Sequence, residues 1–272
     1  MSFDIGHFTL PPGDDFKIES FDPADTGKYE SKKDARKDTK ENLARLQQLH
    51  EKLYAGGDQG LLIVLQAMDT AGKDGTIKHA LGAFNPQGVK VASFGVPSEE
   101  ELSHDFLWRV HDPAPPRGFI GIFNRSHYED VLVVRVKELA PRGVWSARYD
   151  HINNFERLLA DSGITIVKFF LNISPDEQAE RLRERQQNPE KNWKFNPGDL
   201  EDRKLWPEFM RAYEDALTRC NTPWAPWYVV PANRKWYRNL VVTEILVRTM
   251  EGMDLEFPDP PPNIGSYVIP DV

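Results

Sequence analysis

The sequence predicts an α/β fold of three layers, in which a five-stranded parallel sheet lies between helices and a helical lid covers the ligand site. Five short apolar segments alternate with helical patterns, as expected of parallel strands joined by crossover helices. These segments are apolar almost throughout, which is typical of strands buried on both faces. The first of them leads into a glycine-containing loop and a helix, and such joints hold ligands at the carboxyl ends of parallel strands.

The composition limits the classes of protein. The 272 residues are 40% hydrophobic, enough for a core, and we expect one domain over residues 1–272, although the length also allows two small ones. A formal net charge of −8 argues against a nucleic-acid or membrane-surface binder, so any anion site must be a local basic patch. The single Cys220 fits a reducing compartment, and neither an 18-residue apolar run nor a signal peptide is present. We therefore expect a cytoplasmic protein.

The first segments are an arm and a helix. Residues 1–30 are rich in Pro, Gly and Asp and are expected to form an irregular arm. Leucines at helical spacing predict a helix over residues 31–54, which Gly56 and Gly57 stop. Its basic start is best interpreted as a solvated face, with contact to a polyanion as the alternative. The basic residues are Lys32, Lys33, Arg36, Lys37 and Lys40.

A buried strand at residues 61–65 precedes what we interpret as a phosphate loop (residues 67–73). Inward-facing backbone N–H groups, a helix N-terminus and a lysine can together hold phosphate. Gly72 and Lys73 match the end of the G-x-x-x-x-G-K-[ST] pattern, whereas Ala67 replaces its first glycine and Asp74 its Ser or Thr. The predicted phosphate-binding residues here are Gly72, Lys73, Asp74, Gly75, Thr76 and Lys78.

Asp69 is an added acid inside this loop. A carboxylate there would repel phosphate unless a divalent cation lay between them, so we interpret Asp69 as a Mg²⁺ ligand that replaces the missing hydroxyl. The alternative is that Asp69 only caps the following helix.

The middle of the chain predicts two more helices and two more strands. A helix is expected over residues 73–84, a strand over 89–94, a helix over 98–110 with the capping-box pair Ser98 and Glu101, and a strand over 119–123. The polar cluster at residues 124–130 follows that strand and should face the phosphate loop. Arg125, directly after a buried strand, is expected to bind a ligand; a surface position is the alternative.

The next segments lead to the lid. Residues 131–136 are apolar enough to imitate a strand. A helix around residues 152–159 stops at Gly163, and residues 164–171 predict a strand. Ser174, Pro175 and Glu177 are a helix start, and the helix carries Arg181 and Arg185 one turn apart.

The lid is predicted over residues 181–204. Five basic residues against two acids lie between positions 181 and 194, followed by a loop with Pro and Gly. Such a basic, hinged segment can close over phosphates, although a charged surface helix with an ordinary loop is the alternative. A helix over 205–219, a strand over 227–230, a helix over 235–250 and a tail at 254–272, packed on the body or on a neighbour, complete the prediction.

This order of elements is a P-loop kinase architecture. The chain has no C-x-x-C, G-x-S-x-G or H-E-x-x-H motif. Transfer of a phosphoryl group to a nucleotide phosphate requires no strong base, only alignment, Mg²⁺ and cations around the moving group. Lys73, Arg125, Arg185 and Lys194 are suitable cations.

Four motifs resemble the family-2 polyphosphate kinases: MDTAGKDGTIK at 68–78, GIFNRSHYEDVLVVRV at 121–136, PEKNWKF with DLEDRKLW in the lid, and TPWAPWYVVPANRKW at 222–236. They cover about residues 20–250 in the order of the family. The resemblance implies an adenylate- or thymidylate-kinase-like core that transfers phosphoryl groups between inorganic polyphosphate and a nucleotide with Mg²⁺ or Mn²⁺. It also implies a homo-oligomer.

The resemblance assigns roles to individual residues. Lys73 would bind the transferred phosphate, Asp69 the metal, and Arg125 a phosphate beside the third strand. Many members have Asp where this chain has Asn124, which leaves Asp69 and Asp130 as metal ligands. The Asn-Arg-Ser-His-Tyr-Glu-Asp form resembles class III, whose members phosphorylate AMP and ADP. The phosphate or polyphosphate contacts in and beside the lid would be Arg181, Arg185, Lys191 and Lys194, and the nucleotide contacts Glu129, Asp130 and Arg135.

Glu129 and Asp130 would then influence base choice, with guanine nucleotides as further acceptors. The expected partners are thus inorganic polyphosphate and AMP, ADP or ATP, without nucleic acid or membrane. Two other functions stay open: an ATP-dependent nucleotide or small-molecule kinase on this fold, and a non-catalytic nucleotide sensor.

Overall fold

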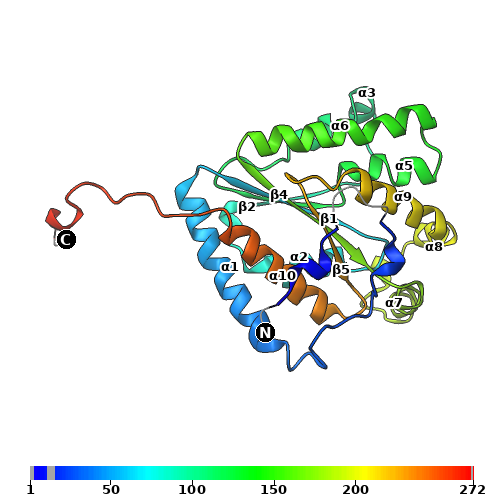
Figure 1. Ribbon diagram of the computed structural model, residues 1–272, viewed down its shortest axis with the longest axis horizontal. Helices are drawn as coiled ribbons and strands as arrows, with labels where there is room; N and C mark the ends of the chain where they lie inside the picture. The colour runs from blue at the N-terminus through cyan, green and yellow to red at the C-terminus, as the bar shows by residue number, and fades with distance from the viewer. Residues whose placement is uncertain (1–2, 11–15, 271) are drawn as a thin grey trace.

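The computed structural model describes residues 3–10, 16–270 and 272. Parts of the predicted arm and tail, residues 1–2, 11–15 and 271, lie outside this range. Five parallel strands form one sheet in the order β2-β3-β1-β4-β5, which confirms the predicted sheet (Figure 1). The strands are β1 (Gly60–Gln66), β2 (Val89–Ser93), β3 (Ile120–Asn124), β4 (Ile164–Asn172) and β5 (Trp227–Pro231).

Helices cover both faces of the sheet. One layer contains α1 (Arg36–Gly56), α2 (Lys73–His79) and α10 (Lys235–Glu251); the other contains α5 (Val133–Val136), α6 (Arg142–Asp161) and α9 (Trp206–Arg219) (Figure 1). All of β1 and all of β4 except the half-buried Thr165 are buried, so both strands pack between these layers. The three-layer prediction is therefore correct.

Three predicted elements differ in detail. Residues 98–110 form two short helices, α3 (Glu99–Ser103) and α4 (Trp108–His111), because Asp105 accepts the N–H of Leu107 and starts a new turn. The first still begins with the predicted capping box. The helix after Lys73 ends at His79 and continues as a 3₁₀ turn, Leu81–Ala83.

Residues 131–136 are not a strand. They follow the 3₁₀ turn η5 (His127–Asp130) and form α5. The N–H groups of Val131, Leu132 and Val136 bond to carbonyls three or four residues earlier, so the backbone is satisfied locally. Val131 and Leu132 are buried nevertheless, which explains why the segment is apolar.

The two ends of the chain behave differently. The described part of the arm lies along β5 and α9: Thr9 bridges to Tyr228, and the N–H of Ile18 bonds to Glu214. The tail runs away from the body (Figure 1), and residues 256–270 are exposed throughout. Residues 256–259 still lie beside residues 52–59 of the body, and the described residues after them extend away from it. No helix of the described residues is long and apolar enough to cross a membrane.

Candidate active site

The phosphate loop curls tightly at the carboxyl end of β1. Thr70 and Gly72 both have left-handed backbones, with φ of 64° and 110°. Lys73 begins α2, and its buried Nζ donates to the carbonyl oxygen of Ala67 at 2.7 Å. The ammonium group thus lies across the loop, where it can meet a bound phosphate. Burial lowers the pKa of Lys73, and the carboxylate of Asp69 acts against this shift.

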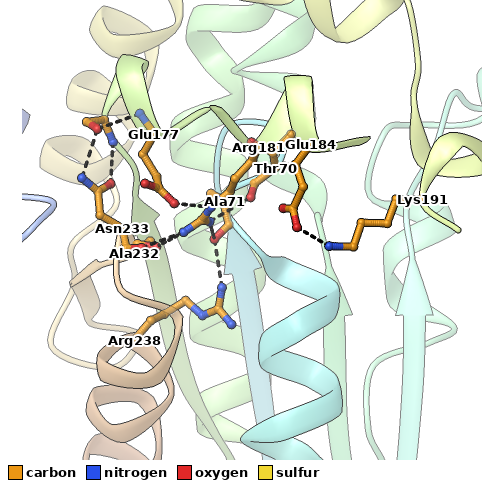
Figure 2. A network of polar contacts seen from close by, with 10 residues as sticks. Thr70, Ala71, Glu177, Arg181, Glu184, Lys191, Ala232, Asn233 and Arg238 are labelled. Carbon is orange, nitrogen blue, oxygen red and sulfur yellow. Dashed lines mark hydrogen bonds and ion pairs between the residues drawn. The ribbon is translucent and has the colours of Figure 1, made fainter. Parts of the chain in front are cut away.

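Arg181 holds the loop from behind (Figure 2). It lies on α7 (Pro175–Gln187). Its Nε donates to Glu177, Nη1 to the carbonyls of Thr70 and Ala71, and Nη2 to two further carbonyls, those of Ala232 and Asn233. All five N–H donors are used. In this structure Arg181 thus holds the backbone of the loop, and its predicted contact with phosphate stays a prediction.

Arg238 on α10 also donates to the carbonyl of Ala71, at 3.0 Å (Figure 2). It is buried, and among the ion pairs of the described residues it takes part in none. Its other hydrogen bonds go to Asn239. Burial and the charge of Arg181 lower the pKa of Arg238 to about 10. Two neighbouring cations behind the loop favour an anion in front of it. Sequence reasoning missed Arg238, which belongs to no motif and is 167 positions from Ala71.

The polar cluster after β3 lies beside the loop, as expected. Arg125 donates to Oδ1 of Asp69 at 2.9 Å, and its own backbone is left-handed with φ of 62°. Its N–H bonds to Leu65, since β1 and β3 are neighbours. Asn124 donates to Asp74 at 3.0 Å. Asp69, Lys73 and Arg125 thus form one charged centre.

Glu129 belongs to the same centre. Burial raises the pKa of its carboxyl, while the nearby charges of Arg125 and Lys73 act in the opposite direction. The charges of Arg125 and Lys73 thus act on the carboxyl of Glu129, and its predicted influence on base choice stays a prediction.

Asp130 and Arg135, which were predicted to contact a metal ion or a nucleotide, form ion pairs with other side chains of the protein. Oδ1 of Asp130 accepts from Arg148 at 2.9 Å, and its Oδ2 is 3.7 Å from Arg109. An acid held by two arginines is a poor metal ligand, so we no longer assign the metal to Asp130. Arg135 on α5 pairs with Asp215 and Tyr149 and stacks on Trp145. These contacts commit Arg135 to the helical layer rather than to a nucleotide.

The predicted lid contains the end of α7, a 3₁₀ turn (Asn192–Lys194) and α8 (Gly198–Lys204). Arg185 donates to the carbonyl of Lys194 and to Oδ2 of Asp199, both at 3.2 Å. Nζ of Lys194 lies 3.7 Å from Oδ2 of Asp74. Lys191 pairs with Glu184 (Figure 2). The lid segment therefore contacts the loop through Arg181 and the start of α2 through Lys194, while Arg185 and Lys191 pair with acids of the lid segment itself.

Asp199 is a site residue that motif reasoning missed. It is buried and accepts a hydrogen bond from Arg185 at 3.2 Å. Burial, with a further contribution from Asp69, raises the pKa of Asp199 to about 6. Its place in the lid motif offered no signal, since Asp199 opens an ordinary charged helix in sequence.

The raised pKa predicts a pH effect on stability. The folded state binds this proton more tightly than the unfolded state, so the contribution of Asp199 to stability falls as the pH rises from about 4 to about 6. Without divalent cations, Asp199→Asn should therefore have a higher melting temperature than wild type at pH 7. The difference should be smaller at pH 4.5. Thermal unfolding at both values measures this. Exposed Asp150→Asn is the control, and equal shifts in both variants at both pH values would refute the assignment.

A basic cleft of about 1280 Å³ joins the site to distant segments. Eleven Lys and Arg side chains line it, against the carboxylates of Asp74 and Glu184. They come from residues 32–40 at and just before the start of α1, from α2, the lid and α10. The four cations of residues 32–40 are exposed, as the solvated-face interpretation expects, and they also line this cleft. The eleven are Lys32, Lys33, Arg36, Lys40, Lys78, Arg181, Arg185, Lys191, Lys194, Lys235 and Arg238.

A metal could be held with few protein ligands. No group of three or more His, Cys, Asp or Glu in the described part of the chain is arranged to hold a metal ion. Mg²⁺ needs only one or two carboxylates when substrate phosphates and water complete its shell. Asp69 supplies one carboxylate from the loop, and its charge contributes to the raised pKa of the buried Asp199 in the lid segment, the second candidate ligand. The donor set thus fits Mg²⁺.

A parallel sheet of this order, a lysine-bearing phosphate loop and a basic helical segment above it define a P-loop kinase. The family model of polyphosphate kinase 2 matches residues 29–258. The chain therefore belongs to the polyphosphate kinase 2 family, as its motifs predicted, and it is a phosphotransferase.

Relatives match over nearly the whole chain. The AMP/ADP-polyphosphate phosphotransferase of Meiothermus ruber is 56% identical over 93% of this chain and 95% of its own. The ADP-polyphosphate phosphotransferase of Rhodopseudomonas palustris is 43% identical over 91% and 92%. The crystal structure of polyphosphate kinase 2 from Arthrobacter aurescens TC1 superposes with a TM-score of 0.91 at 43% identity, over 95% of this chain and 93% of that chain.

Proposed function

We propose that this protein transfers the terminal phosphoryl group of inorganic polyphosphate to AMP and to ADP, reversibly, to give ADP and ATP. The observation that carries the proposal is the basic cleft, which extends from the phosphate loop to α1 and the lid. Its cations are spread over several elements, as a chain of phosphates requires and a single terminal phosphate does not. The names of the relatives from M. ruber and R. palustris support the same donor.

Positioning and charge would perform the reaction. Lys73 and Arg125 lie together at the loop and would neutralise the transferred group, while Arg185 and Lys194 add charge from the lid. The oxygen of an acceptor phosphate is already anionic near neutral pH, so it can attack without a strong base. Arg181 and Arg238 would act indirectly, because they hold the carbonyl of Ala71.

Asp69, together with Asp199, would hold Mg²⁺ or Mn²⁺. The ion would neutralise phosphate charge when it is bound. Arg125 donates to Oδ1 of Asp69, so the ion would bind through the other carboxylate oxygen, Oδ2.

We further propose a cytoplasmic homo-oligomer that accepts guanine nucleotides as well. The family resemblance supports the oligomer, and the buried free thiol of Cys220 is compatible with a reducing compartment.

The test is ATP formation from AMP, and separately from ADP, with long-chain polyphosphate and Mg²⁺. ATP from both acceptors is expected, and EDTA should abolish it. ATP from ADP alone would exclude AMP as an acceptor. No ATP from either, together with phosphoryl transfer from ATP to another acceptor, would favour the ATP-dependent kinase; binding without any turnover would favour a sensor.

The start of α1 should matter for long donors. The triple variant Lys32→Ala, Arg36→Ala, Lys40→Ala is expected to raise KM for long-chain polyphosphate roughly tenfold, since each exposed cation adds about 0.2–1 kcal/mol. The KM for ADP should change little. Lys37, Arg45 and Lys52 lie on the same helix outside the cleft, so their triple alanine variant is the matched control. Equal effects of the two triples would show that α1 acts only through net charge.

A further inference from the structure

A fully buried ion pair lies under the polar cluster that follows β3. Lys168, at the centre of β4, has no solvent exposure, and neither has Glu156 on α6. Nζ of Lys168 donates to Oε2 of Glu156 at 2.6 Å, to the hydroxyl of Tyr128 at 2.7 Å and to the carbonyl of Cys220 at 2.7 Å. The ammonium group has three donors, so all of them are used.

Glu156 of this pair also contacts side chains of the turn that follows Arg125. Oε1 of Glu156 accepts from the hydroxyl of Tyr128 at 2.9 Å, and Nε2 of His127 lies 3.2 Å away. His127 and Tyr128 open the turn η5 and are fully buried. Two charged side chains from different elements thus fix two consecutive residues of the segment between Arg125 and Glu129.

That segment needs such support because its backbone is strained. Arg125 has φ of 62°, a left-handed conformation that a residue with a Cβ rarely adopts. Strain of this kind persists only when the surroundings hold the chain on both sides. The pairing of Asn124 with Leu65 holds the chain before Arg125, and the contacts of His127 and Tyr128 hold it afterwards.

Fold stability alone does not account for the pair. A buried ion pair is often no better for stability than apolar side chains of the same volume, because both charges lose their hydration. Burial by itself would raise the pKa of Glu156, but Lys168 and His127 hold it below its ordinary value. The carboxyl is therefore ionised and offers directional acceptors to the turn, which an apolar side chain cannot do.

We infer that Lys168 and Glu156 are positioning residues, which hold the segment 125–129 so that Arg125 faces the phosphate loop. The catalytic part of this inference rests on the proposed function.

The test uses the double variant Lys168→Met, Glu156→Leu, which replaces both charges by apolar groups. Hydrogen exchange of the ligand-free protein should speed up at least tenfold in residues 125–130 and little elsewhere. The kcat for ATP formation should fall at least tenfold, while KM for polyphosphate changes less than threefold. Ile166→Ala is the matched control, because Ile166 is buried two residues earlier on the same face of β4. Tyr128→Phe, which removes one hydroxyl, makes the same test if the double variant does not fold.

Two results for the double variant would overturn the inference. The first is hydrogen exchange in residues 125–130 equal to that of Ile166→Ala. The second is a kcat equal to that of Ile166→Ala, provided that the wild type is active. A wild type without turnover contradicts the proposed function instead. Hydrogen exchange then still decides whether the pair positions the segment.

Discussion

The variant Lys73→Met is expected to lower kcat for phosphoryl transfer by about 10²–10³-fold, the usual loss when a preorganised charge contact to the reacting group is removed. Methionine keeps the apolar stem and nearly the same volume, so the fold should survive. Only the ammonium group is lost, which now lies 2.7 Å from the carbonyl of Ala67. Burial already disfavours the charge of Lys73, so the melting temperature of the ligand-free protein should change by only a few degrees.

Steady-state kinetics with polyphosphate and ADP, together with thermal unfolding, measure both quantities. Lys37→Met is the control, since Lys37 pairs with Glu41 on the solvent side of α1. A Lys73→Met enzyme within tenfold of wild type would show that Lys73 does not contact the transferred group.

The variant Gly72→Ala should lose both stability and activity. Gly72 has φ of 110°, and a Cβ there would lie 1.8 Å from Nη1 of Arg238. To make room, Arg238 must release the carbonyl of Ala71, and the loop then loses one of its two supports. We expect a destabilisation of about 2–4 kcal/mol from strain and a broken buried hydrogen bond. The kcat should fall at least about 100-fold, because a misplaced loop no longer aligns the phosphate.

Denaturant unfolding and kcat are the measurements. Gly143→Ala serves as the control, because Gly143 lies in α6 and a Cβ there would meet nothing within 4 Å. A second variant, Gly72→Ala with Arg238→Ala, removes the clash and should regain part of the stability but not the activity. Full activity in Gly72→Ala would mean that the curl of the loop is not needed for transfer.

Local patterns were sufficient for the elements of the sheet and for the loop. All five strands lie within two residues of the predicted bounds, because fully buried strands leave continuous apolar runs in the sequence. The contact of Asp69 with Arg125 could also be predicted, since both follow strands at one edge of a parallel sheet. The strand order that makes β1 and β3 neighbours was not in the sequence pattern, but the carboxyl ends of parallel strands meet whatever their order.

The partners of individual charges could not be predicted. Arg181 was predicted as a phosphate ligand, yet its donors bond to Glu177 and to carbonyls of the loop and of the residues that follow β5. Asp130 looked like a metal ligand, yet Arg109 and Arg148 hold it. No sequence pattern indicated Arg238 or Lys168, because neither belongs to a motif.

The sequence by itself therefore determined the fold class, the position of the phosphate loop and the family. The fold class and the loop depend on apolar runs and turn residues that are close in the chain, and the family depends on four local motifs. Only the tertiary structure decided which cations face the cleft and which support the loop, why Asp199 shares the site with Asp69, and how the basic start of α1 comes to line the same cleft. The physical reason is that the energy of a charge depends on its burial and on partners that folding brings from far along the chain.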